Sequence, residues 1–247
     1  MTDDKIAGEV VLVTGSSSGI GEAIARRFAG LGAKVVVNSV RSVSAGEKVA
    51  ESLPEAIYVQ ADISNAADCE GLLVSTLKEY GRLDLLVNNA GTTEVIPHED
   101  FEAVTDEIWE RILGVNVIGT WRLSKLAMPI LRKDGGGSII NISSIAGVRP
   151  VGSSIPYSVS KAAINHMTEL MAKVAGPEVR INAVAPGLID TPWTSGWDEM
   201  HESVEKVAPL RRSGLPEDVA EACVGLMRAE YVTGQVLVVD GGLTGVM

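Results

Sequence analysis

The sequence contains few cysteines, few aromatic residues and no long apolar run, and each shortage excludes a class of protein. Cys69 and Cys223 are the only cysteines among its 247 residues, and aromatic residues make up 4% of them. Two distant cysteines form neither a disulfide framework nor a metal-ligand pattern, and they fit a reducing compartment. No apolar run approaches the roughly 20 residues that span a bilayer. We therefore expect neither a membrane segment nor a metal site.

Positive charge is also scarce, since 21 Lys and Arg face 32 Asp and Glu, for a formal net charge of -11. Nucleic acids and anionic membranes bind to basic surfaces, so neither is an expected partner. Residues 1–5 are acidic and only a short apolar run follows them, unlike a secretory signal. These observations predict a cytoplasmic protein in which a local cluster must meet any anionic ligand.

Apolar β-branched runs alternate with helix-length segments along the whole chain. The predicted strands are 10–13, 34–37, 57–59, 83–87, 138–142, 180–184 and 235–239. The predicted helices are 19–31, 66–80, 106–133, 157–175 and 216–227. This alternation predicts an α/β fold over 1–247, a single doubly wound Rossmann-type domain with about seven parallel strands and helices on both faces. The segment 188–215 follows the sixth strand and is predicted to be an irregular substrate lid.

A glycine-rich loop follows the first predicted strand directly. Thr14 to Gly21 reads T-G-S-S-S-G-I-G, and the helix after it would point its N-terminal N–H groups at an anion. This arrangement indicates a phosphate cradle, although three glycines would also fit a simple tight turn.

A phenol and an ammonium lie four residues apart at Tyr157 and Lys161, and Ser144 precedes the tyrosine by thirteen. On a helix this spacing places both side chains on one face, where a fixed positive charge would lower the pKa of the phenol toward the range of acid–base catalysis. Such a pair is often only a packing contact. The two amides and glycine at 88–91, after another strand, make the pattern more specific.

The glycine loop, the 88–91 segment and the serine, tyrosine and lysine, in this order and spacing, closely resemble the classical short-chain dehydrogenase/reductase family, including 3-oxoacyl-acyl-carrier-protein reductases. The resemblance runs from Glu9 to Gly242. It implies a nicotinamide-dependent oxidoreductase that interconverts a ketone and a secondary alcohol. It further implies proton transfer by Tyr157, a ribose contact by Lys161 and stabilisation of the reacting oxygen by Ser144, with Ser143 as its rival.

Other positions take their roles from the same family pattern. Asn116 would bend its helix and hold a water leading to Lys161, unless it is only structural. Trp193 would line the substrate pocket with Ser144 and Tyr157, or pack the lid against the body. The implied cofactor-binding residues are Gly15, Ser17, Ser18, Gly19, Ile20, Gly21, Asn38, Ser39, Arg41, Asp62, Ile63, Asn89, Ala90, Gly91, Tyr157, Lys161, Pro186, Gly187, Ile189 and Thr191. Asp62 could instead cap the next helix with Ser64.

The second strand ends without the acidic residue that usually grips the ribose of NAD, since 34–46 contains no Asp or Glu. Ser39 and Arg41 could instead hydrogen-bond a 2′-phosphate, which a carboxylate would repel. NADP(H) is therefore the favoured cofactor, with NAD(H) as the alternative. Arg41 could also be a solvated loop residue, and Ser18 stands where many NADP-linked relatives carry a second basic residue.

The substrate is the least determined part of the prediction, because the recognition loops carry no motif. A 3-oxoacyl group on an acidic carrier protein would need basic docking residues such as Arg132, Lys133 and Lys173, which could equally be solvated helix ends. A steroid, sugar, polyol or small alcohol is compatible too. A regulator or scaffold with a degenerate site is the alternative from another class, and the intact Ser144, Tyr157 and Lys161 argue against it. The family also implies a homotetramer, with a dimer as the fallback.

Overall fold

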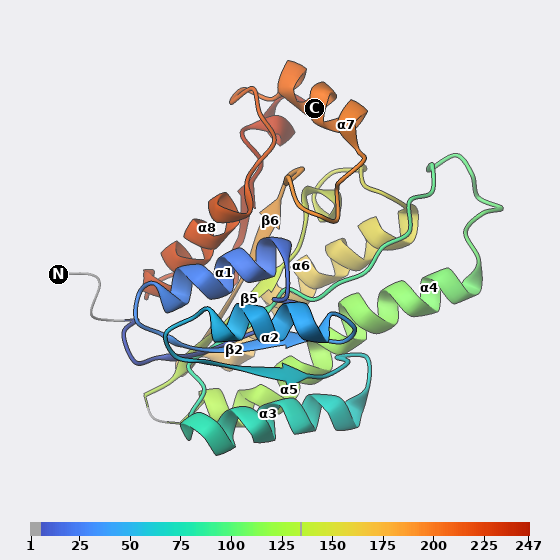
Figure 1. The fold of residues 1–247 in the computed structure, drawn as a ribbon. Coiled ribbons are helices and arrows are strands. Elements are labelled where there is room, and N and C mark those ends of the chain that lie inside the picture. The colour runs from blue at the N-terminus through green and yellow to red at the C-terminus, as the bar shows by residue number, and fades with distance from the viewer. Residues whose placement is uncertain (1–5, 134) are drawn as a thin grey trace.

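The computed structural model describes residues 6–133 and 135–247. The expectation that the chain does not start with a secretory signal concerns residues 1–5, which lie outside this described part. Seven parallel strands form one sheet in the order β3-β2-β1-β4-β5-β6-β7 (Figure 1). The order reverses between β1 and β4, and in open α/β sheets ligands bind in the crevice at that switch point.

All seven predicted strands are confirmed, with slightly different ends. Their bounds are β1 Val10–Val13, β2 Lys34–Ser39, β3 Ala56–Gln60, β4 Leu85–Asn88, β5 Gly137–Ile142, β6 Val179–Pro186 and β7 Val236–Val239. Every residue of β1 and β4 is buried, as expected for central strands of a parallel sheet covered on both faces.

Helices cover both faces of the sheet, in the doubly wound arrangement that the alternating pattern predicts. One core lies under α1 (Gly19–Ala29), α2 (Val43–Glu51) and α8 (Pro216–Arg228). The other lies under α3 (Ala66–Tyr80), α5 (Thr120–Leu131) and α6 (Ile155–Ala175). In Figure 1, α1 and α2 lie above the sheet and α3 and α5 below it.

The predicted helix over 106–133 is not continuous. It consists of α4 (Asp106–Leu113), a π-helical turn at Gly114–Gly119 and α5. The extra residue of a π turn changes the phase of the helix and often marks a functional site. Asn116 lies within this turn and is fully buried.

Two helices were not predicted, and one of them corrects the description of the lid. Segment 188–215 is not irregular throughout, because it contains α7 (Asp198–Val207). None of the α7 residues is buried, although Met200, Val204 and Val207 recur at helical spacing and Val204 packs against a small apolar cluster. The acidic Asp198 and Glu199 in its first turn suit the positive end of the helix dipole. The second unpredicted helix, α2, contains Gly46 in its interior, where glycine is unfavourable.

Candidate active site

The serine that follows β5 is held at a sharp change of chain direction. Ser144 caps the short 3-10 turn Ile145–Gly147, and its Oγ accepts a hydrogen bond from the Ala146 N–H at 3.1 Å. The neighbouring Ser143 is buried, and its Oγ donates to the carbonyl oxygen of Lys161 at 3.1 Å. Because Ser143 is committed to that backbone contact, the geometry favours Ser144 as the serine that serves the pocket.

Tyr157 lies in the first turn of α6, which begins where the sequence places a serine cap. The Ser154 side chain accepts a hydrogen bond from the Tyr157 N–H at 3.4 Å. Burial raises the pKa of the Tyr157 phenol, and a side-chain hydrogen bond with Ser144 counteracts part of that rise. The phenol therefore stays protonated at neutral pH, and Ser144 is near enough to influence its pKa.

Lys161 follows one helical turn later and is almost completely buried. Its Nζ donates to the carbonyl oxygen of Ile142 at 2.9 Å and lies 5.6 Å from the centroid of the Tyr157 ring. Burial lowers the pKa of the ammonium to about 8.

This arrangement corrects one expectation. The ammonium is on the same face as the phenol, as the spacing predicts, but the pKa of Tyr157 rises because burial outweighs the opposing effects. The hydrogen bond of Lys161 goes to the Ile142 carbonyl at the end of β5.

The π turn brings Asn116 to the same place. Its Oδ1 accepts from the Thr92 N–H at 2.8 Å, and its Nδ2 donates to the Thr92 carbonyl at 3.0 Å and to Ser160 Oγ at 2.9 Å. A Cβ built on Gly91 would lie 3.3 Å from Asn116 Oδ1 and 3.8 Å from Lys161 Nζ. Asn116 thus ties the segment after β4 to α6, right beside the lysine.

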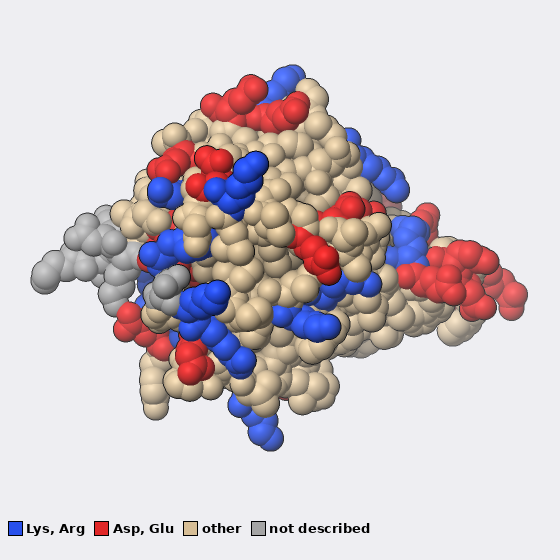
Figure 2. Space-filling model, turned by 90° about the horizontal axis from the view of Figure 1, so that it is seen from below, with Lys and Arg blue, Asp and Glu red and all other residues tan. Residues whose placement is uncertain are grey.

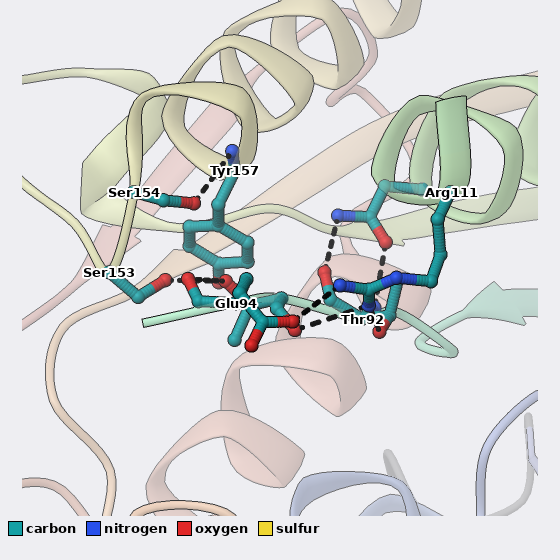
Figure 3. Close-up of polar contacts among 8 residues, drawn as sticks. Thr92, Glu94, Arg111, Ser153, Ser154 and Tyr157 are labelled. Carbon is teal, nitrogen blue, oxygen red and sulfur yellow. Dashed lines mark hydrogen bonds and ion pairs between the residues drawn. The ribbon is translucent and has the colours of Figure 1, made fainter. Parts of the chain in front are cut away.

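A polar rim lies beside this cluster, formed by segments 92–96 and 147–155, which the sequence predicts as pocket walls, and by Arg111, which it does not. Arg111 from α4 contacts Glu94 Oε2 at 2.5 Å and Thr92 Oγ1 at 3.1 Å, and Thr93 Oγ1 lies 2.6 Å from Ser153 Oγ. Figure 3 shows the Tyr157 side and the Arg111 side of this rim joined through the segment after β4. No spacing in the sequence links Arg111 to Glu94, because the two residues come from different elements.

The glycine loop after β1 is packed too closely for side chains. Gly15 has a φ of +63°, and a Cβ on it would lie 2.9 Å from the Ala90 Cα. The Asn89 amide donates to the carbonyl oxygens of Thr14 at 2.9 Å and Gly15 at 3.0 Å. The glycine loop and the segment after β4 are therefore in direct contact.

The start of α1 offers backbone donors to an anion. Its N-cap, Ser18, is exposed and makes no capping hydrogen bond with its side chain, while Ser17 beside it is buried. Gly19, Ile20 and Gly21 form the first turn, and Gly21 leaves no room for a Cβ against the Gly15 carbonyl. A loop of glycines and small serines that leads into an uncapped helix start fits the pyrophosphate of a dinucleotide.

At the end of β2, the three predicted residues lie in different environments. The Asn38 amide is consumed internally, because its Nδ2 donates to the carbonyls of Val59 and Ala61, both at 3.1 Å. Ser39 is buried and its Oγ lies 2.9 Å from Tyr58 Oη, whereas Arg41 is exposed. Asn38 is thus a structural residue here, and Ser39 and Arg41 remain the side chains available to a cofactor.

At the end of β3, the structure excludes one of the two interpretations of Asp62. Asn65 caps α3 by accepting from the Ala67 and Asp68 N–H groups, so Asp62 is not the helix cap. Asp62 Oδ1 accepts from the N–H and hydroxyl of Ser64 at 2.8 and 2.7 Å. Next to it, Ile63 is buried and packs against Gly119 of the π turn.

The lid begins close to the glycine loop. Pro186 ends β6, the Gly187 N–H donates to the Val239 carbonyl at 2.9 Å, and Ile189 is buried. A Cβ on Gly19 would lie 3.4 Å from Thr191 Cγ2, which places the start of the lid against the start of α1. Trp193 is 48% exposed.

Residues 6–133 and 135–247 offer no evident metal site and no membrane-spanning helix. No group of three or more His, Cys, Asp or Glu side chains in these ranges could hold a metal ion. Within the same ranges, no helix is long and apolar enough to cross a membrane.

Comparison with known proteins gives the chain its family. The model of a family described as enoyl-(acyl carrier protein) reductase matches residues 15–244. A Streptomyces violaceoruber protein named granaticin polyketide synthase putative ketoacyl reductase 2 is 57% identical, over 98% of each chain. The 3-oxoacyl-(acyl-carrier-protein) reductase of Thermotoga maritima is 36% identical, over 97% of this chain and 99% of that protein.

A solved structure agrees with these relatives. The 3-ketoacyl-(acyl-carrier-protein) reductase of Brucella melitensis, complexed with NADH, superposes with a TM-score of 0.90 at 33% identity, over 97% of this chain and all of that one (100%). With the sheet order, the glycine loop and the Ser144, Tyr157 and Lys161 cluster, these matches show that the chain belongs to the short-chain dehydrogenase/reductase family of oxidoreductases.

Proposed function

We propose that this protein reduces a ketone on an acyl or polyketide chain to a secondary alcohol, with NADP(H) as the favoured cofactor and NAD(H) as the alternative. The observation that carries the proposal is the convergence of Ser144, Tyr157 and Lys161 at the ends of β5 and α6. The relatives named as ketoacyl reductases support the substrate class.

The roles follow from the contacts. The glycine loop and the start of the lid would hold the dinucleotide, which when bound would supply the hydride that the carbonyl carbon of the substrate accepts. Tyr157 gives its hydroxyl proton to the carbonyl oxygen, so C=O becomes CH–OH and a phenolate remains. Ser144 hydrogen-bonds the same oxygen as its charge develops. The buried ammonium of Lys161 stabilises the phenolate until solvent returns a proton.

The pocket walls are the rim at Thr92 to Glu94, the segment around Ser153 and the lid at 188–215, with Trp193 as a substrate contact. The remaining cofactor positions proposed above keep their roles, except that Asn38 supports the loop rather than the ligand. In this proposal, residues 1–247 form a single domain.

The charge of the protein surface limits where an acidic carrier protein could bind. Exposed acidic residues cluster at the tip formed by the loop after β4 and the start of α4, shown in Figure 2, and they are Glu94, Glu99, Asp100, Glu102, Asp106, Glu107 and Glu110. An acidic carrier protein would be repelled there. Of the basic candidates, Lys133 and Lys173 are exposed, and Arg132 donates to the Val174 carbonyl at the end of α6.

We propose a cytoplasmic homotetramer. Cys69 and Cys223 are both free and buried, as expected of a reducing compartment. Exposed apolar side chains line α5, α6 and the β7 end, namely Trp121, Val159, Leu170, Val174, Leu237, Val246 and Met247. Two such surfaces on one chain suit two different two-fold contacts.

A carbonyl panel tests the proposal. Purified protein should be assayed with NADPH and NADH on 3-oxoacyl thioesters, cyclic ketones, a steroid ketone and, in the oxidative direction, glucose. We expect the highest kcat/KM with a 3-oxoacyl thioester or a polyketide-like ketone and NADPH. Preferred turnover of the steroid or of glucose would reject the substrate class, and no turnover of any substrate would favour a non-catalytic role.

A further inference from the structure

The hydroxyl that contacts Ser39 comes from a different strand, and the structure makes room for it. Tyr58 lies in β3, where it pairs with Val37, and its Oη is 2.9 Å from Ser39 Oγ. Side chains alternate across a strand, so Ser39 and Val37 face the same side of the sheet as Tyr58. This side is covered by α2.

Gly46 explains how the tyrosine ring fits under α2. A Cβ on Gly46 would lie 2.6 Å from Tyr58 Cδ2 and closer still to Cε2, so any side chain there would collide with the ring. A glycine inside a helix is less favourable than alanine, because its backbone loses more conformational freedom. The unfavourable residue in α2 therefore has a local purpose, which is to let the Tyr58 ring lie flat beneath the helix and reach the end of β2.

The direction in which the Tyr58 hydroxyl donates its proton decides whether Ser39 can donate a hydrogen bond to a ligand. Tyr58 has one hydroxyl proton and two acceptors within reach, Ser39 Oγ at 2.9 Å and the Ser39 carbonyl at 3.3 Å. If the proton goes to the closer Oγ, the proton of Ser39 itself is free to point outward. If it goes to the carbonyl, Ser39 keeps its hydrogen bond with Tyr58 only by donating to it. The Ser39 Oγ then presents only lone pairs to the outside, which a phosphate oxygen would avoid.

We propose that Tyr58 is a positioning residue for cofactor choice: by donating to Ser39 Oγ, it holds Ser39 as a hydrogen-bond donor to the 2′-phosphate of NADP(H). This inference rests on the proposed NADP(H) preference and adds a residue outside the β2 turn to it. The hydroxyl of Tyr58 also polarises the Ser39 O–H, since hydrogen bonds in a chain strengthen one another. Arg41 supplies the charge, and Ser39 supplies the directed donor.

The test uses two ligands that differ only in the group concerned, adenosine 2′,5′-bisphosphate and 5′-AMP, titrated calorimetrically without any turnover. Tyr58→Phe keeps the ring under Gly46 and removes the hydroxyl. We expect its affinity for the bisphosphate to fall about fivefold, the scale of one net hydrogen bond, while the affinity for 5′-AMP stays within about twofold. Tyr231→Phe, at an exposed tyrosine beyond α8 near the opposite edge of the sheet, is the matched control.

A double-mutant cycle shows whether Tyr58 acts through Ser39. The variant Ser39→Ala/Tyr58→Phe should bind the bisphosphate no more weakly than Ser39→Ala alone. Additive losses would overturn the inference, and so would an unchanged or stronger bisphosphate affinity in Tyr58→Phe. If the unmodified protein itself bound both ligands equally, the NADP(H) preference would fail and the inference with it, which distinguishes the two failures.

Discussion

The Lys161 ammonium and the Ile142 carbonyl oxygen, 2.9 Å apart, join the start of α6 to the end of β5. This contact lies in a buried environment, which lowers the pKa of Lys161 from 10.5 to about 8. Because folding lowers this pKa, the charged lysine destabilises the folded state below pH 8, and that cost disappears as the pH rises from 8 to 10.5. The charged Lys161 ammonium therefore lowers the stability of the fold, and its presence is explained by its role in the site.

The lowered pKa of Lys161 predicts an alkaline limit on activity. At subsaturating NADPH, where kcat/KM reports the free enzyme, the rate of reduction should fall above about pH 8 as the ammonium loses its proton. Lys161→Arg keeps a charge that does not titrate in this range, so its residual activity should not show that fall between pH 8 and 10. The same alkaline limit in both proteins would assign it to another group.

The tyrosine prediction isolates proton transfer from binding. Tyr157→Phe removes the hydroxyl and keeps the ring, so turnover should drop at least about 100-fold while NADPH binding survives. Ser144→Ala should mainly lower kcat, and Lys161→Ala should weaken cofactor binding as well. Stopped-flow turnover and fluorescence titration of NADPH measure the two effects separately. Near-normal activity of Tyr157→Phe on a confirmed substrate would place the proton donor elsewhere.

The strands could be predicted from the sequence because buried parallel strands are continuous apolar runs, as in β1 and β4. Helix α7 was missed although Met200, Val204 and Val207 recur at helical spacing, because three apolar residues in a ten-residue segment give only a short signal. Helix α2 was hidden by Gly46, whose reason lies in the Tyr58 ring of another element. Local patterns therefore identified elements with a long apolar signal and missed those in which the signal is short or interrupted.

The same division applies to the site. The family pattern identified Ser144, Tyr157 and Lys161, because their spacing along one helix and one strand end is a local property. The partner of the Lys161 ammonium, the internal use of the Asn38 amide and the Arg111–Glu94 contact depend on which elements meet in space. No spacing rule contains that information, and the pKa of Tyr157 was therefore predicted to shift in the wrong direction.

A carboxylate at the end of β2 should reverse the cofactor preference. Ser39→Asp places a negative charge where the 2′-phosphate of NADPH is expected, while the Tyr58 hydroxyl can donate to the new carboxylate. We expect the ratio of NADPH to NADH affinity to fall at least about 100-fold, since an unpaired like charge adds to the loss of a donor. Ser44→Asp adds the same charge at an exposed position of α2 and should change the ratio less than about threefold. An unchanged ratio in Ser39→Asp would move the recognition site away from this turn.

Glu9 predicts a pH-dependent stability that is independent of catalysis. Burial, with the nearby Asp84, raises the pKa of Glu9 from 4.5 to about 7. A raised carboxyl pKa leaves the folded state unaffected below pH 4.5 and destabilises it progressively up to pH 7.

Replacement by the neutral amide should remove this penalty. Because the Glu9 side chain is 27% exposed, we expect Glu9→Gln to raise the free energy of unfolding at pH 8 by about 2 kcal/mol, less than the full pKa shift would give. Near pH 4.5 the two proteins should be nearly equal. Urea unfolding at both pH values measures this, and Glu55→Gln, in an exposed pair with Lys34, should change stability by less than about 1 kcal/mol. A gain of the same size at both pH values would refute the assignment to Glu9 ionisation.

If the protein is a tetramer, a charge placed on one apolar helix face should dissociate it into dimers. Leu170 is 56% exposed on α6, and Leu170→Glu would bury an unpaired carboxylate in any contact made by that face. We expect light scattering at micromolar concentration to show a tetramer for the unmodified protein and a dimer for this variant. Val74→Glu, at a 63% exposed position of α3, should remain a tetramer because α3 belongs to neither proposed contact surface. Dissociation of Val74→Glu with Leu170→Glu intact would assign the contact to α3 instead, and a stable monomer of the unmodified protein would exclude both surfaces.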